Sequence, residues 1–320
     1  MKLNHLFKWS GTCRTFLIAA FAILGAGALK ADNYFTTGGL NYTGANSDTN
    51  SGANVNLGNA GLAPSGSHHG WAIFALSGGV TITDPDSFGQ PDVFGDVGIA
   101  GGGNLTMSLS TIQGDVFRDT GSYNNGGTIN GSTTVNYGSY LNPGVTSAQN
   151  SSTTAGILNR DIGSGATLLT LSGAVPAGIL ANNTTALSLN NTPGSITGSA
   201  DHNYVLNLTD IIMSGANAIL TLHGTATTNY LINVNRLMTL GTNSKIVLAD
   251  GLTAANVMFN VKNNSPGTNY DVTLSGGSVV NGLILAANRN VKLTGASTVY
   301  GEVIAKSVSL SGHSQVIVSP

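Results

Sequence analysis

The sequence has one cysteine and very little charge. Cys13 is the only cysteine in 320 residues, so the chain cannot form an internal disulfide. Charged residues make up 8% of the chain, against roughly a quarter in an average globular protein. Glu302 is the only glutamate, and 44 glycines stand beside many Ser, Thr and Asn residues, all poor helix formers. These shortages exclude a disulfide scaffold and disfavour a mainly helical fold.

Apolar residues are nevertheless plentiful. They make up 41% of the chain, and many of them are Val, Ile and Leu, which favour strands. A disordered chain is usually much less hydrophobic. The composition therefore predicts an all-β protein with enough apolar material for a core.

The N-terminal residues 1–31 have the pattern of an export signal. Lys2, Lys8 and Arg14 precede an apolar run of about 14 residues, and Ala31 offers a small residue for cleavage. About 20 apolar residues are needed to span a bilayer, so an uncleaved membrane anchor is the less favoured alternative. Cleavage would remove Cys13 and leave a mildly acidic chain without a transmembrane segment. We therefore expect a secreted or cell-surface protein that does not bind nucleic acid.

The remainder divides into two parts by composition. Residues 32–70 are rich in Gly, Asn, Ser and Thr and are predicted to be a flexible, low-complexity leader. Residues 71–320 contain an internal repeat, which is clearest where segments beginning at Val272, Val291 and Val308 share alternating apolar residues followed by Gly. A short, recurring unit of this kind predicts a β-solenoid, in which each repeat buries its apolar side against its neighbours.

Strand alternation explains one coil of this solenoid. Val272 and Leu274 should point inward while Thr273 and Ser275 point outward, and the later repeats follow the same rule. The glycines at equivalent positions, Gly276, Gly295 and Gly312, should turn the corners. About three short strands per coil describe a parallel β-helix.

Some apolar residues do not fit inside the coil. Leu285 and Ile304 share the outward side with Leu283 and Glu302. A helix, a partner or the leader could pack on them, or they could be an exposed aliphatic pair. The best helix candidate is Val145 to Arg160, although its Ser and Thr content makes the signal weak.

The repeats resemble a known family. Segments 256–261, 280–286 and 299–305, with Gly95–Gly98 and Gly114–Val116, resemble the ice-binding-protein-like family of secreted microbial β-solenoids and related repeats in choice-of-anchor bacterial surface proteins. The resemblance implies a right-handed, irregular β-helix with one long helix along its side. The expected Ala-rich helix is replaced here by the polar segment near Val145.

The outward hydroxyl groups suggest a binding face. The candidate residues are Thr273, Ser275, Thr294, Ser309 and Ser311, with Lys292 interrupting them. We expect a non-enzymatic adhesive or binding protein whose partner is an extracellular surface, a polymer or ice, with no cofactor and no metal. Ice binding is the first alternative function. Equally, Ser and Thr could simply fill solvent-facing strand positions.

A β-helical carbohydrate-active enzyme is the second alternative. The acid-rich group that could support catalysis consists of Asp84, Asp86, Asp92, Asp96 and Asp115, with Arg118 nearby. However, two Gly-Asp-Val units place Asp96 and Asp115 at equivalent repeat positions, and repetition favours a structural role. His68 and His69 have no neighbouring carboxylate or cysteine in sequence and are predicted to be surface residues.

Overall fold

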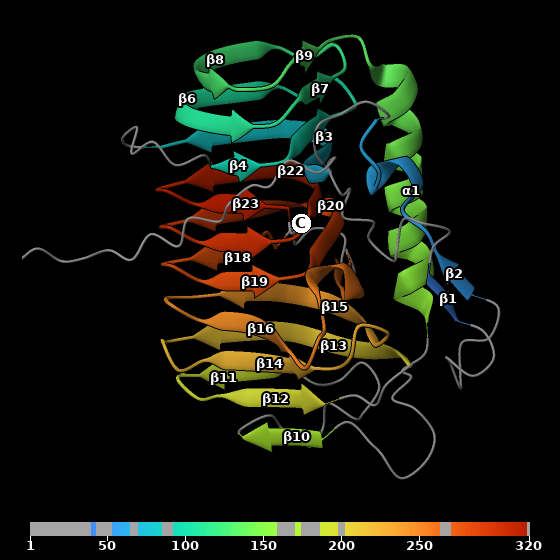
Figure 1. Ribbon diagram of the computed structural model, residues 1–320, viewed down its shortest axis with the longest axis vertical. Coiled ribbons are helices and arrows are strands. Elements are labelled where there is room, and N and C mark those ends of the chain that lie inside the picture. Colours follow the sequence, from blue (N-terminus) through green and yellow to red (C-terminus); the bar gives the residue numbers. More distant parts are fainter. Residues whose placement is uncertain are drawn as a thin grey trace, which may run out of the picture.

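The fold is a parallel β-helix with one long helix against its side (Figure 1). The computed structural model describes residues 40–42, 53–64, 70–84, 92–158, 170–173, 186–197, 202–262 and 270–318. Among these residues, 21 strands form one continuous sheet, and all their pairings are parallel except that of β10 (Thr170–Gly173). The predicted fold class is confirmed. The predicted export signal lies outside the described residues.

Each coil has three sides. The first, which we call the helix face, contains β5 (Asp96–Ile99), β7 (Val116–Arg118), β9 (Thr133–Thr134) and β17 (Val257–Val261). The second face contains β4 (Val93–Phe94), β12 (Gly194–Thr197), β14 (Ile219–His223), β16 (Lys245–Ala249), β19 (Val279–Asn281), β21 (Thr298–Tyr300) and β23 (Gln315–Ile317). The third side contains β11 (Leu187–Asn190) and β18 (Val272–Ser275).

Long strands bend around the corners and belong to two sides. The first halves of β3 (Trp71–Thr83), β13 (Asn203–Ser214), β15 (Asn229–Leu240), β20 (Leu283–Thr294) and β22 (Val303–Ser311) lie on the helix face, and their second halves lie on the third side. β6 (Leu105–Gln113) and β8 (Tyr123–Ile129) run from the third side to the second face. The register shifts at most of these bends, which lets one strand change direction without losing its partners.

The order of the coils differs from the order of the sequence. β22 and β23, the last strands, pair in parallel with β3 and β4, so the C-terminal coil lies in the middle of the stack. In Figure 1 these red strands lie directly beside the teal ones, with β8 at one end and β10 at the other. We call the β22–β3 and β23–β4 pairings the seam. The chain therefore forms the coils of β3 to β9 at one end of the stack and then runs back along the side as α1. The remaining strands, β10 to β23, form the other coils, and the last of these coils pairs with β3 and β4.

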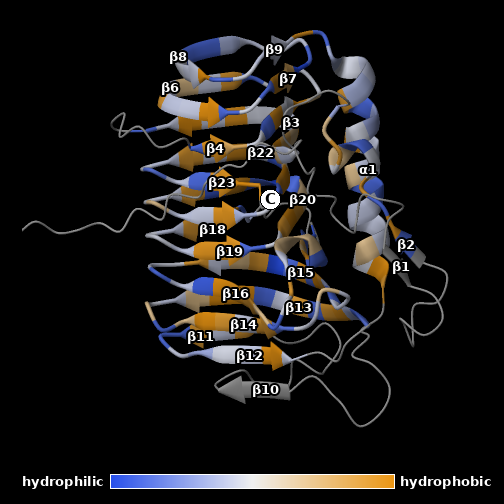
Figure 2. Ribbon diagram, in the orientation of Figure 1, coloured by the Kyte–Doolittle hydropathy of each residue, from blue (hydrophilic) through white to orange (hydrophobic). Residues whose placement is uncertain are grey.

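The interior is the apolar ladder that the repeat predicts. Val272 pairs with Val291, which pairs with Val308, and all three are at most 2% exposed. Figure 2 shows apolar and polar residues side by side along the coils, and in β18 buried and partly exposed residues alternate. Burial of a Val or Leu side chain contributes roughly 1.5–3 kcal/mol, so every coil depends on the coils above and below it.

The predicted corner glycines adopt the backbone conformation that requires glycine. Gly276, Gly295 and Gly312 have φ values of 62°, 63° and 62°, a region that other residues rarely occupy. A Cβ at Gly295 would also meet the backbone nitrogen of Gly276 at 3.2 Å. The coils can therefore stack closely at this corner.

The helix α1 (Gly138–Ile157) begins seven residues before the segment that the sequence favoured. Its buried residues include Leu141, Gly144, Ala148, Ser151 and Ala155, whose spacing of three to four residues puts them on one side. They are mostly small, and a Cβ at Gly144 would come within 2.8 Å of Phe74. The helix was hard to predict because its buried residues are mostly Gly, Ala and Ser, instead of the usual stripe of large apolar residues.

The outward apolar residues of the helix face are covered. Leu283, Leu285 and Ile304 are at most 1% exposed and form a second hydrophobic cluster with α1. The expectation that something packs on this side is confirmed. Glu302 also points out of the coil, but it is 7% exposed, and burial raises the pKa of its carboxyl group well above the usual range.

A ladder of asparagines also holds α1. Asn207, Asn233 and Asn260 occupy equivalent positions on β13, β15 and β17, and each donates a side-chain hydrogen bond to a carbonyl of the last part of α1 or of the residue after it, at 2.8–3.1 Å. The amides also bond to one another, at 2.9 Å and 2.8 Å. The ladder therefore ties the C-terminal part of α1 to the helix face of the coil.

Part of the predicted leader is packed. β1 (Leu40–Tyr42) and β2 (Ala53–Val55) form an antiparallel pair, and a short 3-10 helix, η2 (Gly58–Ala60), follows. Another 3-10 helix, η4 (Ala254–Asn256), precedes β17. Val55, Leu57 and Ala60 are fully buried in the cluster around α1. Residues 53–64 therefore differ from the loosely packed segment that composition suggested, because these three apolar residues find a partner surface on the helix. The predicted domain boundaries remain predictions.

Candidate binding face

The third side of the coil carries two columns made up, except for Lys292, of short hydroxyl residues, and we call it the hydroxyl face. The first column is Thr239, Thr273, Lys292, Ser309, Thr81 and Thr106, in stacking order. The second column is Ser275, Thr294, Ser311, Thr83 and Ser108. All these side chains are partly or fully exposed. Parallel strands repeat at about 4.8 Å, so the hydroxyl groups form a regular array.

The structure brings together all five residues that the sequence proposed as a binding face. Thr273, Ser275, Thr294, Ser309 and Ser311 lie in these columns, and their role in binding remains a prediction.

Five further residues extend the array and were not predicted from the sequence, namely Thr81, Thr83, Thr106, Ser108 and Thr239. The alternation in Val80–Thr83 matches that in Val272–Ser275 and could have indicated two of them. Only the seam makes them neighbours of the C-terminal repeats.

Several hydroxyl groups have a defined orientation. Ser275 donates to the carbonyl of Leu240 at 3.3 Å, and Thr294 donates to that of Leu274 at 3.5 Å. Thr83 donates across the seam to the carbonyl of Leu310, also at 3.5 Å. The residues between them point inward and are buried, so the strands that carry the hydroxyl groups cannot tilt independently.

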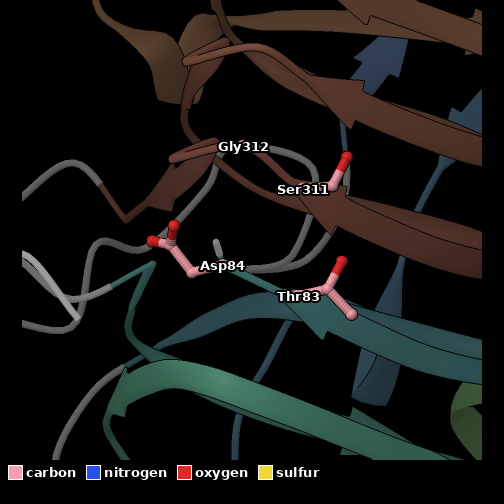
Figure 3. Close-up of a pocket in the computed structure, with 4 residues that line it drawn as sticks. All are labelled: Thr83, Asp84, Ser311 and Gly312. Carbon is pink, nitrogen blue, oxygen red and sulfur yellow. The ribbon is translucent and has the colours of Figure 1, made fainter. Parts of the chain in front are cut away.

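A shallow depression of about 370 Å³ lies where the hydroxyl face crosses the seam. Thr83, Asp84, Ser311 and Gly312 line it, and the hydroxyl groups of Thr83 and Ser311 point the same way (Figure 3). At its corner, His313 Nδ1 lies 2.8 Å from Asp84 Oδ1. This contact joins the C-terminal coil to the coil of β3.

Asp92 lies beside this corner. Its Oδ2 accepts a hydrogen bond from the amide of Thr111 at 2.7 Å, one coil further along the stack. Burial, with a smaller contribution from neighbouring Asp84, raises the pKa of Asp92 to about 6. Asp84 and Asp92 therefore lie close enough to influence each other, and His313 is the basic group paired with Asp84.

Asp96 and Asp115 each accept a hydrogen bond from the backbone of a neighbouring coil. Asp96 Oδ1 accepts a hydrogen bond from the amide of Asp115 at 2.8 Å, and Asp115 Oδ1 accepts one from the amide of Ser132 at 2.7 Å. Arg118 donates to the carbonyl of Gly121. Asp92 directly precedes β4 on the second face, whereas Asp96 is the first residue of β5 on the helix face, so these two acids belong to different sides of the coil.

His68, His69 and Asp86 lie outside the described residues. Within the described part, no three His, Asp, Glu or Cys side chains gather as metal ligands would. No helix in that part is long and apolar enough to cross a membrane.

Comparison with known proteins supports the repeat-based resemblance. A sequence model of the family described as "putative ice-binding-like adhesive domain" matches residues 26–317. The chain belongs to this family.

Several solved structures are similar to this ice-binding-like adhesive domain. An ice-binding protein of the Antarctic ascomycete Antarctomyces psychrotrophicus is 19% identical, with a TM-score of 0.47 over 83% of this chain and 98% of that one. A domain of an ice-binding protein of Shewanella frigidimarina is 14% identical, with a TM-score of 0.47 over 86% of this chain and 100% of that one. No curated protein sequence matches the chain significantly.

Proposed function

We propose that this protein binds ice through the hydroxyl face. The observation that carries the proposal is the in-register pair of columns, in which short hydroxyl side chains repeat from Thr239 to Thr106 on a rigid backbone. Ice is an ordered, uncharged surface of hydrogen-bonding groups. A regular array of hydroxyl and methyl groups can meet such a surface at many points at once.

Because the hydroxyl face is rigid, a weak contact between each coil and the ice surface is sufficient for binding. A flexible face would lose conformational entropy for each side chain that it orders on binding, and the seam and the packed interior have already ordered this one. Contacts that form together also add up, because each coil holds the next one in place over the surface. The proposal therefore needs no deep pocket.

We also infer that the protein acts outside the cell and without catalysis. The N-terminal pattern supports export, and the hydrogen bonds from Asp96 and Asp115 to neighbouring coils support structural roles for these acids. Family membership agrees with a role in surface binding.

Adhesion to a polysaccharide is the second candidate. The depression at Thr83, Asp84 and Ser311 favours it, because hydroxyl and carboxylate groups around a hollow can bond to a sugar hydroxyl, whereas a flat crystal surface would leave the hollow unfilled. The family description also includes adhesion.

One substitution distinguishes a functional hydroxyl face from an inert one. Thr294→Lys places a long, hydrated cation in the second column and should lower the uptake of protein into growing ice by roughly tenfold, equivalent to about 1.4 kcal/mol. The matched control is Thr298→Lys, which makes the same change on the second face. Equal uptake of both variants would show that the hydroxyl face does not contact ice.

The same proteins should be tested on insoluble polysaccharides. Native protein that is excluded from ice but is retained on a polysaccharide, with Thr294→Lys impaired, would overturn the ice proposal in favour of adhesion. Retention on neither would remove both functions for this face.

A further inference from the structure

Lys292 is the one charged residue in the two columns of the hydroxyl face. It lies between Thr273 and Ser309 in the first column, and its side chain is 51% exposed. A lysine ammonium is compact and strongly hydrated, and its stem is flexible. A free lysine here would hold its own water between the protein and an ordered surface.

The ammonium is not free. Lys292 Nζ lies 2.6 Å from Asp271 Oδ2, and Asp271 precedes β18 on the neighbouring coil. A side chain that reaches a diagonal neighbour in a sheet has to lie along the sheet surface. The lysine is therefore drawn sideways, toward the edge of the hydroxyl face.

Asp271 is itself held in position. Asn290 donates from Nδ2 to Asp271 Oδ1 at 2.9 Å, and Ser307 donates from Oγ to Asn290 Oδ1 at 2.7 Å. Asn290 and Ser307 are paired across β20 and β22, and they form with Asp271 a third column beside the first. One carboxylate oxygen is thus occupied by Asn290, and the other is directed at Lys292.

We propose that Asp271 is a positioning residue that holds Lys292 down beside the hydroxyl columns and so keeps the face open to an uncharged, ordered ligand. The inference rests on the proposed ice-binding function and deepens it, because it assigns the preference for an uncharged ligand to one ion pair. An isolated surface ion pair contributes little to stability. The role that we assign to the Asp271–Lys292 pair is therefore to keep the lysine side chain and its charge away from the hydroxyl columns.

A double-mutant cycle tests this role through ice uptake. Asp271→Asn retains the group that accepts from Asn290 but releases the lysine, and should lower ice uptake several-fold. Lys292→Thr continues the hydroxyl column and should bind ice at least as well as the native protein. In the Lys292→Thr background, Asp271→Asn should have no further effect, because nothing remains to be held.

A structural role for Asp271 would give a different pattern. If Asp271→Asn lowers ice uptake equally with and without Lys292, or leaves uptake unchanged in the native background, the proposal is overturned. Denaturant unfolding of all four proteins checks that the variants are folded, since a loss of fold would impair both backgrounds.

A second measurement does not depend on ice and separates this inference from the proposed function. The rate of acetylation of Lys292 is compared by mass spectrometry with those of the exposed Lys245 and Lys306 in the same protein. Release from Asp271 should make Lys292 react several-fold faster in Asp271→Asn, while the two reference lysines stay unchanged. Unchanged reactivity of Lys292 would refute the clamp even if native protein binds ice, whereas faster reactivity in a protein that ignores ice would refute only the proposed function.

Discussion

The two halves of β20 show how one strand can serve two different surfaces. In its first half, Leu283 and Leu285 point outward and are buried beneath α1. In its second half, Lys292 and Thr294 point outward and are exposed. The inward residues of both halves are equally apolar. The difference teaches that the chemistry of the outward positions decides whether a side of the coil is covered or left open.

The cover is specified by both apolar and polar groups. On the helix face, apolar side chains pack against α1. Beside them, the asparagine ladder donates hydrogen bonds to carbonyls in the C-terminal part of α1. The hydroxyl face offers short groups with little apolar area to bury. Burial of such a face would cost desolvation of the hydroxyl groups and return little hydrophobic stabilisation.

The largest expected effect on stability comes from shortening one side chain in the half of β20 that α1 covers. Leu285→Ala removes a side chain that is fully buried between the coil and α1, and should lower the free energy of unfolding by about 2–5 kcal/mol. Thr294→Ala on the same strand should change it by at most about 0.5 kcal/mol. Urea denaturation measures both. Similar losses for the two variants would mean that the hydroxyl face is also a packed surface.

The seam should respond to pH through Asp92. Because burial raises its pKa to about 6 in the folded state, the folded protein prefers the neutral carboxyl group. The contribution of Asp92 to stability should therefore be greatest below its unfolded pKa of about 4 and fall by at most about 3 kcal/mol as the pH rises to about 6. Asp92→Asn keeps the shape without titrating, so its stability should exceed that of the native protein at neutral pH.

Thermal unfolding across this pH range provides the measurement for Asp92. Asp250→Asn is the control, since Asp250 is 66% exposed and pairs with His223 away from the seam. Parallel pH profiles for the native protein and Asp92→Asn would contradict the prediction.

The smallest expected effect concerns the polar part of the helix cover. Asn233→Ala leaves the carbonyl of Ala155 and the side-chain oxygen of Asn207 without this donor, and should cost about 1–3 kcal/mol. The helical circular-dichroism signal should then be lost before the sheet unfolds. Asn124→Ala, at an exposed position on β8, is the control. Unchanged helix stability would mean that apolar contacts alone hold α1.

The prediction from sequence succeeded where the signal was local. The alternation around Val272, Val291 and Val308 predicted inward and outward residues correctly, and the outward Leu285 and Ile304 indicated a covered side. The five candidate hydroxyl residues also share one face. It failed for residues 53–64, where only a few apolar residues stand among Gly and Asn, and for the start of α1, whose buried residues are mostly small. Both compositions resemble that of a loop.

Strand alternation and corner glycines are enough to specify a coil, because they depend on residues only a few positions apart. The order in which coils stack is different, since any coil offers its neighbours the same backbone hydrogen bonds and a similar apolar ladder. The seam therefore came from long-range packing, once α1 had carried the chain back along the side. That packing joins Ser309 to Thr81 and makes two separate repeats into one hydroxyl face.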